Sequence, residues 1–429
     1  MKVLLIGSGG REHALAWKIR QSPLLKELYA APGNAGINEI AQGVALPAED
    51  IEGLIRFAKE KAIDLTVVGP ESPLAAGIVD RFQAAGLAIF GPTQAAAKIE
   101  SSKIFAKEMM VRAGVPTAEF KIFDDAARAK HYLVEAEPPF VIKADGLATG
   151  KGVVVSTSCE EAVQIVTRFM EEKSLGDAGA RVLVEEKLEG EELSILVLTD
   201  GESLIPLASA QDHKRVLDMD RGPNTGGMGA YSPCPFLSNE NFQKALNQTI
   251  RPLLQEMARQ GTPYRGVLYA GLMLTKNGPY VLEYNARLGD PEAQAILPRL
   301  KSDLLPVLAQ IAKGGFPQET LEWDERSALN VVIASAGYPG TYEKGYVITG
   351  PEKFKGQGDV FIFHAGTGRN DRGDLVTAGG RVLSVTALGE TLKAAQEKAY
   401  EAVYQIRFEG AHFRRDIGRR ALESVGSKP

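Results

Sequence analysis

The sequence predicts a multidomain protein of mixed α/β and α+β class, and three observations support this fold class. In the first hundred residues, short aliphatic runs alternate with segments of helical periodicity, and each run stops at a Gly/Pro turn. Two hairpin turns follow, at Asp200-Gly201 and Asn277-Gly278. A strand pattern starts again near Ala328, and a length of 429 residues is sufficient for roughly two to four domains.

The N-terminal region is expected to form a parallel sheet with helices between its strands. Buried runs that end in Gly/Pro turns are typical of such sheets, and their ligands bind where the strands end. The expected strands are Lys2–Ile6, Glu27–Ala31, Asp64–Val68 and Leu87–Phe90. The turns after them are Gly7–Gly10, Pro32–Gly36, Gly69–Glu71 and Gly91–Thr93. We therefore expect a Rossmann-like domain over residues 1–101.

The middle of the chain is expected to be an α+β body with a small inserted lobe at about 118–190. A capped helix is predicted over Ser101–Gly114. The lobe is predicted to contain strands Phe140–Lys143, Gly152–Ser156 and Arg181–Glu185 and a helix over Cys159–Glu171. The body is predicted to contain the strand pairs Glu192–Thr199 with Ser203–Ser209, and Leu268–Thr275 with Pro279–Asn285.

The C-terminal region, residues 327–429, is expected to be a separate small α/β domain. Its predicted strands are Asn330–Ser335, Val360–Phe363 and Val382–Thr386, followed by a long helix from Thr391 to about Arg407. The preceding body then spans residues 102–326, and its most linker-like stretch is Gly314–Asp324.

Composition limits the class of function. Hydrophobic residues make up 44% and charged residues 24% of the chain, as is ordinary for a globular protein. A net charge of −5 gives no reason to expect nucleic acid or an anionic membrane as a partner. The cysteines, Cys159 and Cys234, lack metal-ligand spacing, which favours a reduced cytoplasmic setting. No signal peptide is visible, and no apolar run approaches the roughly 18 residues of a membrane span.

The most informative motif is Glu283-x-Asn285-x-Arg287, which follows an apolar strand. Residues i and i+2 of a strand share a face, so these three side chains are expected to project together. Carboxylate and amide oxygens suit Mg²⁺, which takes further ligands from phosphate groups, and arginine offers a planar fork to phosphate or carboxylate. The motif therefore indicates Mg²⁺–nucleotide chemistry. The alternative is an edge strand with a solvated polar face.

The turn after the first strand is similar to a dinucleotide-binding fingerprint but departs from it. Glu12 stands at the position of the third glycine, and the second strand ends in Ala30-Ala31-Pro32 without an acid for a ribose hydroxyl. NAD binding is therefore not expected. A glycine turn before a helix suits a single phosphate, although a tight turn that binds nothing is an alternative.

A second glycine-rich loop, at residues 143–152, lies between two predicted strands of the inserted lobe. It is not a P-loop, because three residues separate Gly146 from Gly150 and Gly152 stands where a hydroxyl residue is needed. Its backbone amides and lysines can still bind phosphate groups. The alternative is a flexible hairpin loop with solvated lysines.

Two further polar segments follow apolar strands. Glu185–Glu192 can pair with a purine through backbone groups and hold a ribose through a carboxylate, although a solvated charge run is the simpler interpretation. Ser209–Arg215 leads into the glycine-rich loop Gly222–Ala230, and a loop of that kind is usually functional. His213 is a lone histidine that could be a structural donor, and no catalytic triad pattern is present.

Together these segments resemble the ATP-grasp ligases and, within them, the glycinamide ribonucleotide synthetase (phosphoribosylamine–glycine ligase) family. The N-terminal matching motifs are Gly-Ser-Gly-Gly-Arg-Glu-His at 7–13, Pro-Gly-Asn-Ala-Gly at 32–36 and Gly-Pro-Glu at 69–71. The central ones are Lys-Ala-Asp-Gly-Leu-Ala at 143–148, Gln-Asp-His-Lys-Arg at 211–215, Pro-Asn-Thr-Gly-Gly-Met-Gly-Ala-Tyr-Ser-Pro at 223–233 and Asn-Ala-Arg-x-Gly-Asp-Pro-Glu at 285–292. The resemblance extends to Gly-Ala-His-Phe-Arg-Arg-Asp-Ile-Gly at 410–418.

The resemblance implies an ATP-grasp body whose inserted lobe acts as a lid. It also implies ligation of glycine to 5-phosphoribosylamine through glycyl phosphate, in purine biosynthesis, with ATP as co-substrate and Mg²⁺ or Mn²⁺ as the metal. We expect no nucleic-acid or membrane partner, and transient contact with the upstream amidotransferase that supplies the amine.

Roles for individual residues follow from the same resemblance. The metal ligands are Glu283 and Asn285. Arg287 is assigned to charge on the transferring group, and Asp212 or Asp290 to the ammonium group of glycine. ATP binding is assigned to Lys103, Lys143, Gly146, Gly150, Lys151, Gly152, Glu185, Glu186, Lys187, Leu188 and Glu192. Binding of phosphoribosylamine is assigned to Gly9, Gly10, Gly33, Asn34, Ala35, Gly36, Glu71 and Lys214.

One departure from the wider superfamily concerns the metal site. Many ATP-grasp enzymes carry a metal carboxylate on the strand before Glu-x-Asn, but here that strand, Leu268–Met273, has no acid. Either the metal has fewer protein ligands or Asp212 or Asp290 supplies an oxygen. Two rival functions are a biotin- or aminoimidazole-dependent carboxylase, which would need bicarbonate, and a sensor that binds ATP without turnover.

Overall fold

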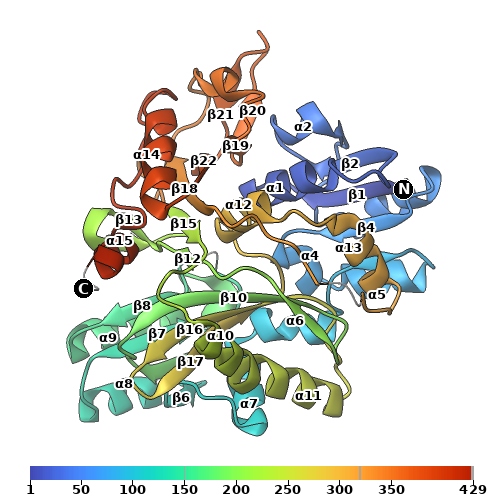
Figure 1. Ribbon diagram of the computed structural model, residues 1–429. Helices are drawn as coiled ribbons and strands as arrows, with labels where there is room; N and C mark the ends of the chain where they lie inside the picture. The colour runs from blue at the N-terminus through green and yellow to red at the C-terminus, as the bar shows by residue number, and fades with distance from the viewer. Residues whose placement is uncertain (149, 318–319, 427–429) are drawn as a thin grey trace.

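The N-terminal elements form a parallel sheet of order β3-β2-β1-β4-β5, which lies on one side of the molecule (Figure 1). The structure is a computed structural model that describes residues 1–148, 150–317 and 320–426. The strands are β1 (Lys2–Gly7), β2 (Glu27–Pro32), β3 (Gln42–Gly43), β4 (Leu65–Val68) and β5 (Ile89–Phe90). The helices are α1 (Gly10–Ile19), α2 (Ile37–Ile40), α3 (Ile51–Glu60), α4 (Glu71–Ala75) and α5 (Ile78–Ala84). The predicted parallel sheet is confirmed; the two-residue β3 is too short to leave a sequence signal.

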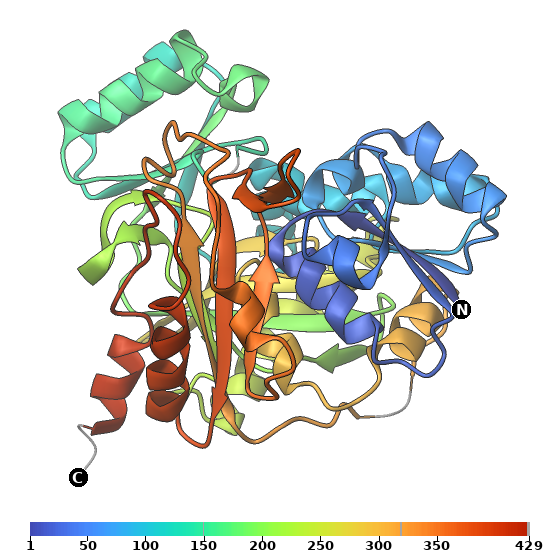
Figure 2. The same ribbon diagram turned by 90° about the horizontal axis from the view of Figure 1, so that it is seen from above.

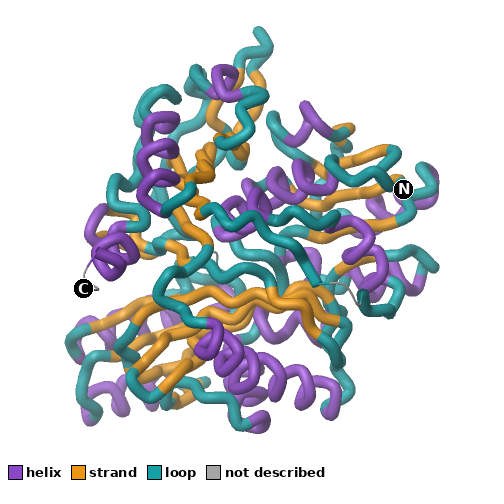
Figure 3. The backbone as a smooth tube through the Cα atoms, viewed as in Figure 1, coloured by secondary structure: helices purple, strands orange, loops and turns teal. Residues whose placement is uncertain are grey.

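The central body is an antiparallel sheet of order β11-β10-β16-β17, which runs across the lower part of Figure 3 with helices beneath it. Its strands are β10 (Glu191–Thr199), β11 (Leu204–Pro206), β16 (Gly266–Thr275) and β17 (Gly278–Asn285). Gly201 and Gly278 have φ of 108° and 116°, as the two predicted hairpin turns require. The other helices of this region are α10 (Asn239–Ala245), α11 (Arg251–Arg259), α12 (Glu292–Ile296) and α13 (Leu304–Ala312).

The helix expected over Ser101–Gly114 is present as α7 (Lys103–Ala113), and a helix that was not predicted, α6 (Gln94–Ser101), precedes it. They meet at Ser102, whose hydroxyl accepts from the Phe105 amide at 3.1 Å and donates to Asp145 at 2.9 Å. Lys103 therefore begins α7 beside the loop of the inserted lobe.

Residues 120–186 form the inserted lobe, which projects from the body in Figure 2. Its sheet has the order β6-β9-β7-β8. The strands are β6 (Phe120–Phe123), β7 (Phe140–Ala144), β8 (Val153–Ser156) and β9 (Val182–Glu186), with helices α8 (Ala126–Glu135) and α9 (Cys159–Val166). Strand β6 and helix α8 were not predicted. Ile142, Ile165 and Val182 belong to a hydrophobic cluster confined to this lobe, so the lobe has the core it needs to move as one unit.

The C-terminal sheet has the order β12-β15-β18-β22-β19, and two of its strands come from the centre of the chain. The five strands are β12 (Gln211–Asp212), β15 (Gly229–Ser232), β18 (Ser327–Ala334), β19 (Val360–His364) and β22 (Arg381–Gly389). The remaining elements are β13 (Arg215–Leu217), β14 (Arg221–Asn224), β20 (Thr367–Arg369), β21 (Leu375–Thr377), α14 (Leu392–Val403) and α15 (Arg419–Gly426). The polar segment 209–230 is thus built onto the C-terminal sheet. Helix α14 starts after its cap Thr391, as predicted, but ends at Val403 rather than near Arg407.

Two predicted segments extend beyond what can be described. Thr149 of the 143–152 loop and residues 318–319 of the stretch 314–324 lie outside the described residues. Among the described residues, no helix has both the length and the apolar character needed to cross a membrane.

Candidate active site

A cleft of about 640 Å³ lies where the central sheet, the inserted lobe and segment 212–226 meet. The sequence-predicted residues that line it are Glu71, Lys103, Lys143, Gly150, Gly152, Glu185, Glu186, Lys187, Leu188, Glu192, Asp212, Lys214, Glu283, Asn285, Arg287 and Asp290. The predicted residues outside this lining are Gly9, Gly10, Gly33, Asn34, Ala35, Gly36, Gly146 and Lys151. The structure therefore brings together the predicted nucleotide, metal and chemistry groups, and it leaves the N-terminal glycine turns apart from them.

Two buried lysines share one buried carboxylate at the lobe side of the cleft. Lys143 on β7 lies 3.0 Å from Glu185 and donates to the Leu282 carbonyl at 2.9 Å. Lys107 on α7 lies 3.2 Å from the same carboxylate, and burial lowers the pKa of Lys107 to about 8. The second carboxylate oxygen of Glu185 is buried and has no hydrogen-bond partner among the described residues. Sequence reasoning missed Lys107, although its i+4 spacing from Lys103 places both on one helix face.

Lys103 connects the central body with the loop of the inserted lobe. Its ammonium donates to the Gly146 carbonyl at 3.1 Å, and its backbone amide donates to the Asp145 carbonyl at 3.3 Å. Burial lowers the pKa of Lys103, and the nearby Glu283 carboxylate opposes that shift. Gly146 thus takes part in the site through its carbonyl without lining the cleft.

The Glu283–Asn285 pair lies at the end of β17, where Glu283 is opposite Gly271 and Asn285 is opposite Tyr269 on β16. Burial pushes the pKa of Glu283 up, but the charges of Lys214, Lys143 and Lys103 outweigh burial and hold it below its ordinary value. Among the described residues, no protein group makes a hydrogen bond to this carboxylate, so its oxygens are available to a cation.

Arg287 lies beyond the strand, which corrects the expectation that all three motif residues share one strand face. The strand ends because the Ala286 amide donates to Glu100 at 2.7 Å instead of continuing the ladder. The guanidinium turns back nevertheless, and it donates to the Asn285 side chain at 3.3 Å. The motif is therefore brought together by a turn rather than by strand periodicity.

Two carboxylates hold the Arg287 guanidinium, at 2.8 Å for Glu100 and 3.2 Å for Glu71. Although burial pushes it up, the charges of Arg287 and Arg11 hold the pKa of Glu71 at about 2. Burial raises the pKa of Glu100. Sequence reasoning missed Glu100, because it lies in an ordinary amphipathic helix and only the fold brings it to Arg287.

A second acidic cluster surrounds Lys214, which also lines the cleft. The ammonium of Lys214 lies 2.9 Å from Asp212 and 3.2 Å from Glu192, and these carboxylates raise its pKa despite burial. Burial raises the pKa of Asp212 to about 7, and Glu292 and Glu192 reinforce the shift against the charge of Lys214. Glu292, which was not predicted, is buried and accepts from Ser194 at 3.1 Å. The cluster offers carboxylate oxygens to an ammonium group.

Asp290 is held by groups from three separate parts of the chain. The Arg11 amide donates to it at 3.3 Å, Gln294 donates at 2.7 Å, and Arg381 lies 3.3 Å away. Burial pushes its pKa up, but the charges of Arg381 and Arg11 hold it below the ordinary value. Arg381, from the C-terminal sheet, was not predicted, because nothing around it in the sequence marks it as a site residue.

The turn between β1 and α1 has protein carboxylates where a phosphate was expected. The Gly9 amide donates to Glu12 at 2.6 Å, and the Arg11 side chain donates to the same carboxylate at 2.5 Å. A Cβ on Gly7 would lie 2.6 Å from Glu12, and one on Gly69 would lie 2.1 Å from it. These glycines therefore make room for the Glu12 side chain, which replaces the third glycine of a dinucleotide fingerprint.

Backbone amides of the turn after β2 also donate to an acceptor within the protein. The side-chain oxygen of Asn34 accepts from the Gly36 and Ile37 amides, each at 2.9 Å. Its amide group donates to the carbonyls of Ser8 and His364, each at 2.8 Å. Asn34 thus ties the two N-terminal turns to β19 of the C-terminal sheet.

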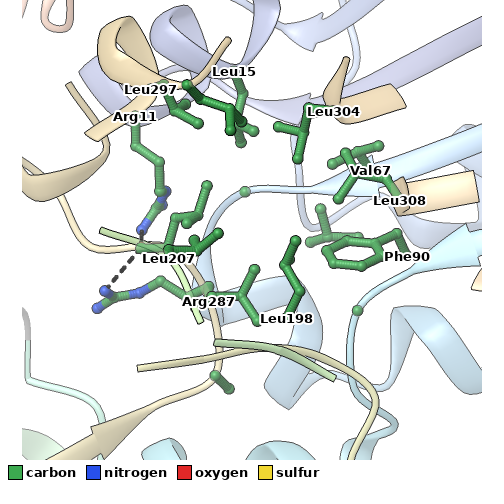
Figure 4. Close-up of a pocket in the computed structure, with 17 residues that line it drawn as sticks. Arg11, Leu15, Val67, Phe90, Leu198, Leu207, Arg287, Leu297, Leu304 and Leu308 are labelled. Carbon is green, nitrogen blue, oxygen red and sulfur yellow. Dashed lines mark hydrogen bonds between the residues drawn. The ribbon is translucent and has the colours of Figure 1, made fainter. Parts of the chain in front are cut away.

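A small apolar cavity of about 20 Å³ marks the junction of the N-terminal sheet, the central sheet and helix α13 (Figure 4). Val67, Phe90 and Leu308 form one wall, and Arg11 and Arg287 lie at the opposite edge. Both guanidinium groups donate to the Leu288 carbonyl at 3.2 Å. The space is about that of one water molecule, so we assign it to packing between domains.

The residues present fit a metal ion that takes most of its ligands from a bound nucleotide and water and only a few from the protein. Among the described residues, no three His, Cys, Asp or Glu side chains converge as a metal group. Mg²⁺ commonly binds one or two protein oxygens and fills its other positions with phosphate oxygens and water. Glu283 and Asn285 meet that requirement without a third acid.

Comparisons with known proteins agree along nearly the whole chain. Three family models match: Phosphoribosylglycinamide synthetase, N domain, at residues 1–100; its ATP-grasp (A) domain at 101–293; and its C domain at 328–420. A phosphoribosylamine–glycine ligase of Halalkalibacterium halodurans is 50% identical over 98% of this chain and 97% of its own length. One of Escherichia coli is 51% identical over 99% of both chains.

Solved structures show the same fold. A phosphoribosylamine–glycine ligase of Thermotoga maritima has a TM-score of 0.85 at 37% identity, over 97% of this chain and 100% of that chain. The biotin carboxylase domain of the Hydrogenobacter thermophilus 2-oxoglutarate carboxylase has a TM-score of 0.73 at 18% identity, over 96% of this chain and 91% of that chain. The second likeness concerns the fold alone.

Proposed function

Because the chain belongs to the phosphoribosylglycinamide synthetase family, we propose that the cleft described above is where its reaction takes place. The chain is an ATP-dependent ligase that joins glycine to 5-phosphoribosylamine through glycyl phosphate. The products are glycinamide ribonucleotide, ADP and phosphate, and the reaction belongs to purine biosynthesis.

The observation that carries the proposal is the concentration of cations around Glu283. Transfer of the γ-phosphoryl group to the carboxylate of glycine brings like charges together, so those charges must be neutralised first. Lys103 and Lys143 face the cleft from α7 and β7 and are suited to the nucleotide phosphates. Arg287 is suited to the transferring phosphoryl group if that group displaces Glu71 or Glu100 from the guanidinium.

The metal would be held by Glu283 and Asn285 together with nucleotide phosphates. When bound, Mg²⁺ or Mn²⁺ would supply charge neutralisation to those phosphates. The cations nearby keep Glu283 ionised, which is the form that a metal requires.

For the ammonium group of glycine we propose Asp212 rather than Asp290. The carboxylate of Asp290 is already engaged by Arg11, Gln294 and Arg381. Asp212 lies instead in a cluster with Glu192 and Glu292, which has more carboxylates than cations. The ammonium group of glycine would add a second cation, beside Lys214, to these three carboxylates.

The nucleotide base is proposed to lie against the segment Glu185–Leu188, whose residues line the cleft beside Lys143. Phosphoribosylamine is proposed to enter from the N-terminal sheet, where Glu71 lines the cleft at the end of β4. Backbone amides of the N-terminal glycine turns already donate to protein side chains in this structure. We therefore propose that these turns form a wall of the entrance rather than a binding site for the phosphate group.

We make three further proposals, on the domain boundaries, the location and a protein partner. Domain boundaries are proposed at 1–101, 102–326 and 327–429, with a lid at about 118–190. A cytoplasmic location is proposed from the two free cysteines, Cys159 and Cys234. Transient contact with the amidotransferase that produces the labile amine is proposed because free phosphoribosylamine would decay.

The test is an ADP-release assay with chemically generated phosphoribosylamine. We expect ADP formation that requires glycine and formation of glycinamide ribonucleotide that requires the amine. Turnover with bicarbonate in place of glycine would support a carboxylase, and ATP binding without turnover would support a sensor; either result would contradict the proposal.

A further inference from the structure

Residues 213–227 form a hairpin that closes one side of the cleft, and we call it the cleft hairpin. Strands β13 and β14 pair within it, and its tip contains Met219 and Asp220 with φ of 60° and 52°. Two consecutive residues other than glycine in the left-handed region are sterically disfavoured and persist only where surrounding contacts enforce them. The hairpin is therefore held in place by its neighbours.

The C-terminal end of the chain holds the tip. Asp416 accepts from the Met219 amide at 2.8 Å, and Asp220 pairs with Arg414 at 2.8 Å and with Arg420 at 2.7 Å. Arg414 is fully buried and also donates to the Arg215 carbonyl at 3.1 Å. The sequence motif at 410–418 is thus used to fix the hairpin.

The C-terminal sheet holds the base of the hairpin through Arg381. Its guanidinium donates to the Gly226 carbonyl at 2.7 Å and to the Asp290 carbonyl at 2.8 Å. The Tyr338 hydroxyl accepts from the Gly226 amide at 3.0 Å. One arginine therefore connects the hairpin with the segment that follows the Glu283–Asn285 strand.

The opposite side of the base contacts the inserted lobe. The Asn224 side chain donates to the Val153 carbonyl at 3.4 Å. A Cβ on Gly150 would lie 3.2 Å from the Thr225 carbonyl, so the glycine loop of the lobe fits directly against the hairpin. The lobe, which has its own core, consequently rests on a surface that the C-terminal sheet holds.

We propose that Arg381 is a positioning residue that keeps Asn224–Gly227 in place as the surface on which the lid closes. The inference rests on the proposed function, because it concerns protection of glycyl phosphate. In a poorly closed cleft, the oxygen of water would bond to the acyl carbon and the acyl–phosphate C–O bond would break. The phosphate would leave with the bonding electrons, glycine would form, and the proton of water would pass to solvent.

The test measures ADP formed per glycinamide ribonucleotide formed, in the full-length enzyme at saturating glycine and amine. Wild type is expected to give nearly one ADP per product. Arg381→Gln is expected to raise this ratio by about threefold or more, and Arg381→Lys to restore part of the coupling. A purely structural loss would lower both rates and leave their ratio unchanged.

The matched control is Arg326→Gln, since Arg326 immediately precedes β18 of the same sheet and pairs with Asp324 and Asp359 outside the cleft. It is expected to leave the ratio at the wild-type value. If Arg381→Gln does not fold, Tyr338→Phe removes only the hydroxyl that accepts from Gly226 and is expected to raise the ratio less. A wild-type ratio in every folded Arg381 and Tyr338 variant would overturn the inference, whereas a wild type that makes no product would overturn the proposed function instead.

Discussion

Two glycine-rich turns, at residues 7–12 and 143–152, follow β-strands and were both assigned to phosphate groups, but they differ in what occupies them. At the first turn, Glu12 and Asp290 accept from the Gly9 and Arg11 amides. At the second, Lys143 faces the cleft and the loop lies against the cleft hairpin. The first turn joins domains, and the second borders the proposed nucleotide site.

The difference shows that a glycine-rich turn indicates close approach of the backbone to another group. The spacing of the glycines does not identify whether that group is a ligand or another part of the protein. Near Gly7 and Gly69 the partner is the Glu12 side chain, since a Cβ at either position would collide with it. Near Gly150 it is the backbone of Thr225. The two cases are separated by Glu12, an acid three residues after Gly9 that stands in place of the third glycine.

The largest expected effect is a loss of activity on mutation of the cleft, which the second turn borders. Glu283→Ala removes the proposed metal carboxylate and should lower kcat by about 10³-fold or more, which corresponds to about 4 kcal/mol in the transition state. Because Glu283 makes no hydrogen bond to the described residues, the melting temperature of the Glu283→Ala variant should stay close to that of wild type. Glu189→Ala, an exposed acid outside the cleft lining, is the control. Near-normal activity of Glu283→Ala at saturating Mg²⁺ would refute the metal assignment.

A smaller effect of a different kind is expected at the N-terminal turn. Glu12→Ala leaves the buried Arg11 guanidinium without its partner at 2.5 Å and should reduce the free energy of unfolding by about 3 kcal/mol. The KM for ATP should not change, because this turn lies outside the cleft lining. Denaturant unfolding and initial rates measure both. Glu12→Gln keeps an acceptor for the Gly9 amide and should lose less of the free energy of unfolding. A Glu12 variant that lost ATP affinity with unchanged stability would contradict the roles given to the two turns.

The effect that is smallest at neutral pH concerns the contact of the N-terminal turns with the C-terminal sheet. Burial lowers the pKa of His364 to about 4, while the unfolded value is near 6.5. Between these values the unfolded chain binds the extra proton, so stability falls with falling pH by up to about 1.4 kcal/mol per pH unit. His364→Asn should remove that share of the slope. Exposed His131, replaced by Asn, serves as control, and equal slopes for wild type and His364→Asn would exclude the effect.

The fold could be read from the sequence where periodicity and turn residues agree. The parallel N-terminal sheet and both hairpins are of this kind, since Gly201 and Gly278 supply the required positive φ. Strand β6 escaped prediction because its pattern has two exposed residues between half-buried ones, so it shows little alternation. The sharing of β12 and β15 with the C-terminal sheet depends on pairing between distant residues and leaves no local signal.

The site could be predicted where its residues lie in one short motif, as Glu283 and Asn285 do. Lys107, Glu100 and Arg381 lie in ordinary helices or a strand and reach the cleft only through tertiary contacts. The role of Glu12 was within reach, because an acid at the third residue of a helix is a recognised capping signal.

The most direct test of the difference between the two turns is hydrogen exchange with and without a non-hydrolysable ATP analogue and Mg²⁺. The account predicts that peptides covering 143–152 become protected on binding, because the phosphates would contact Lys143 and hold the loop closed over the cleft. Peptides covering 7–12 should exchange at the same rate in both states, because their amides already have protein acceptors. Protection at 7–12 without protection at 143–152 would contradict it.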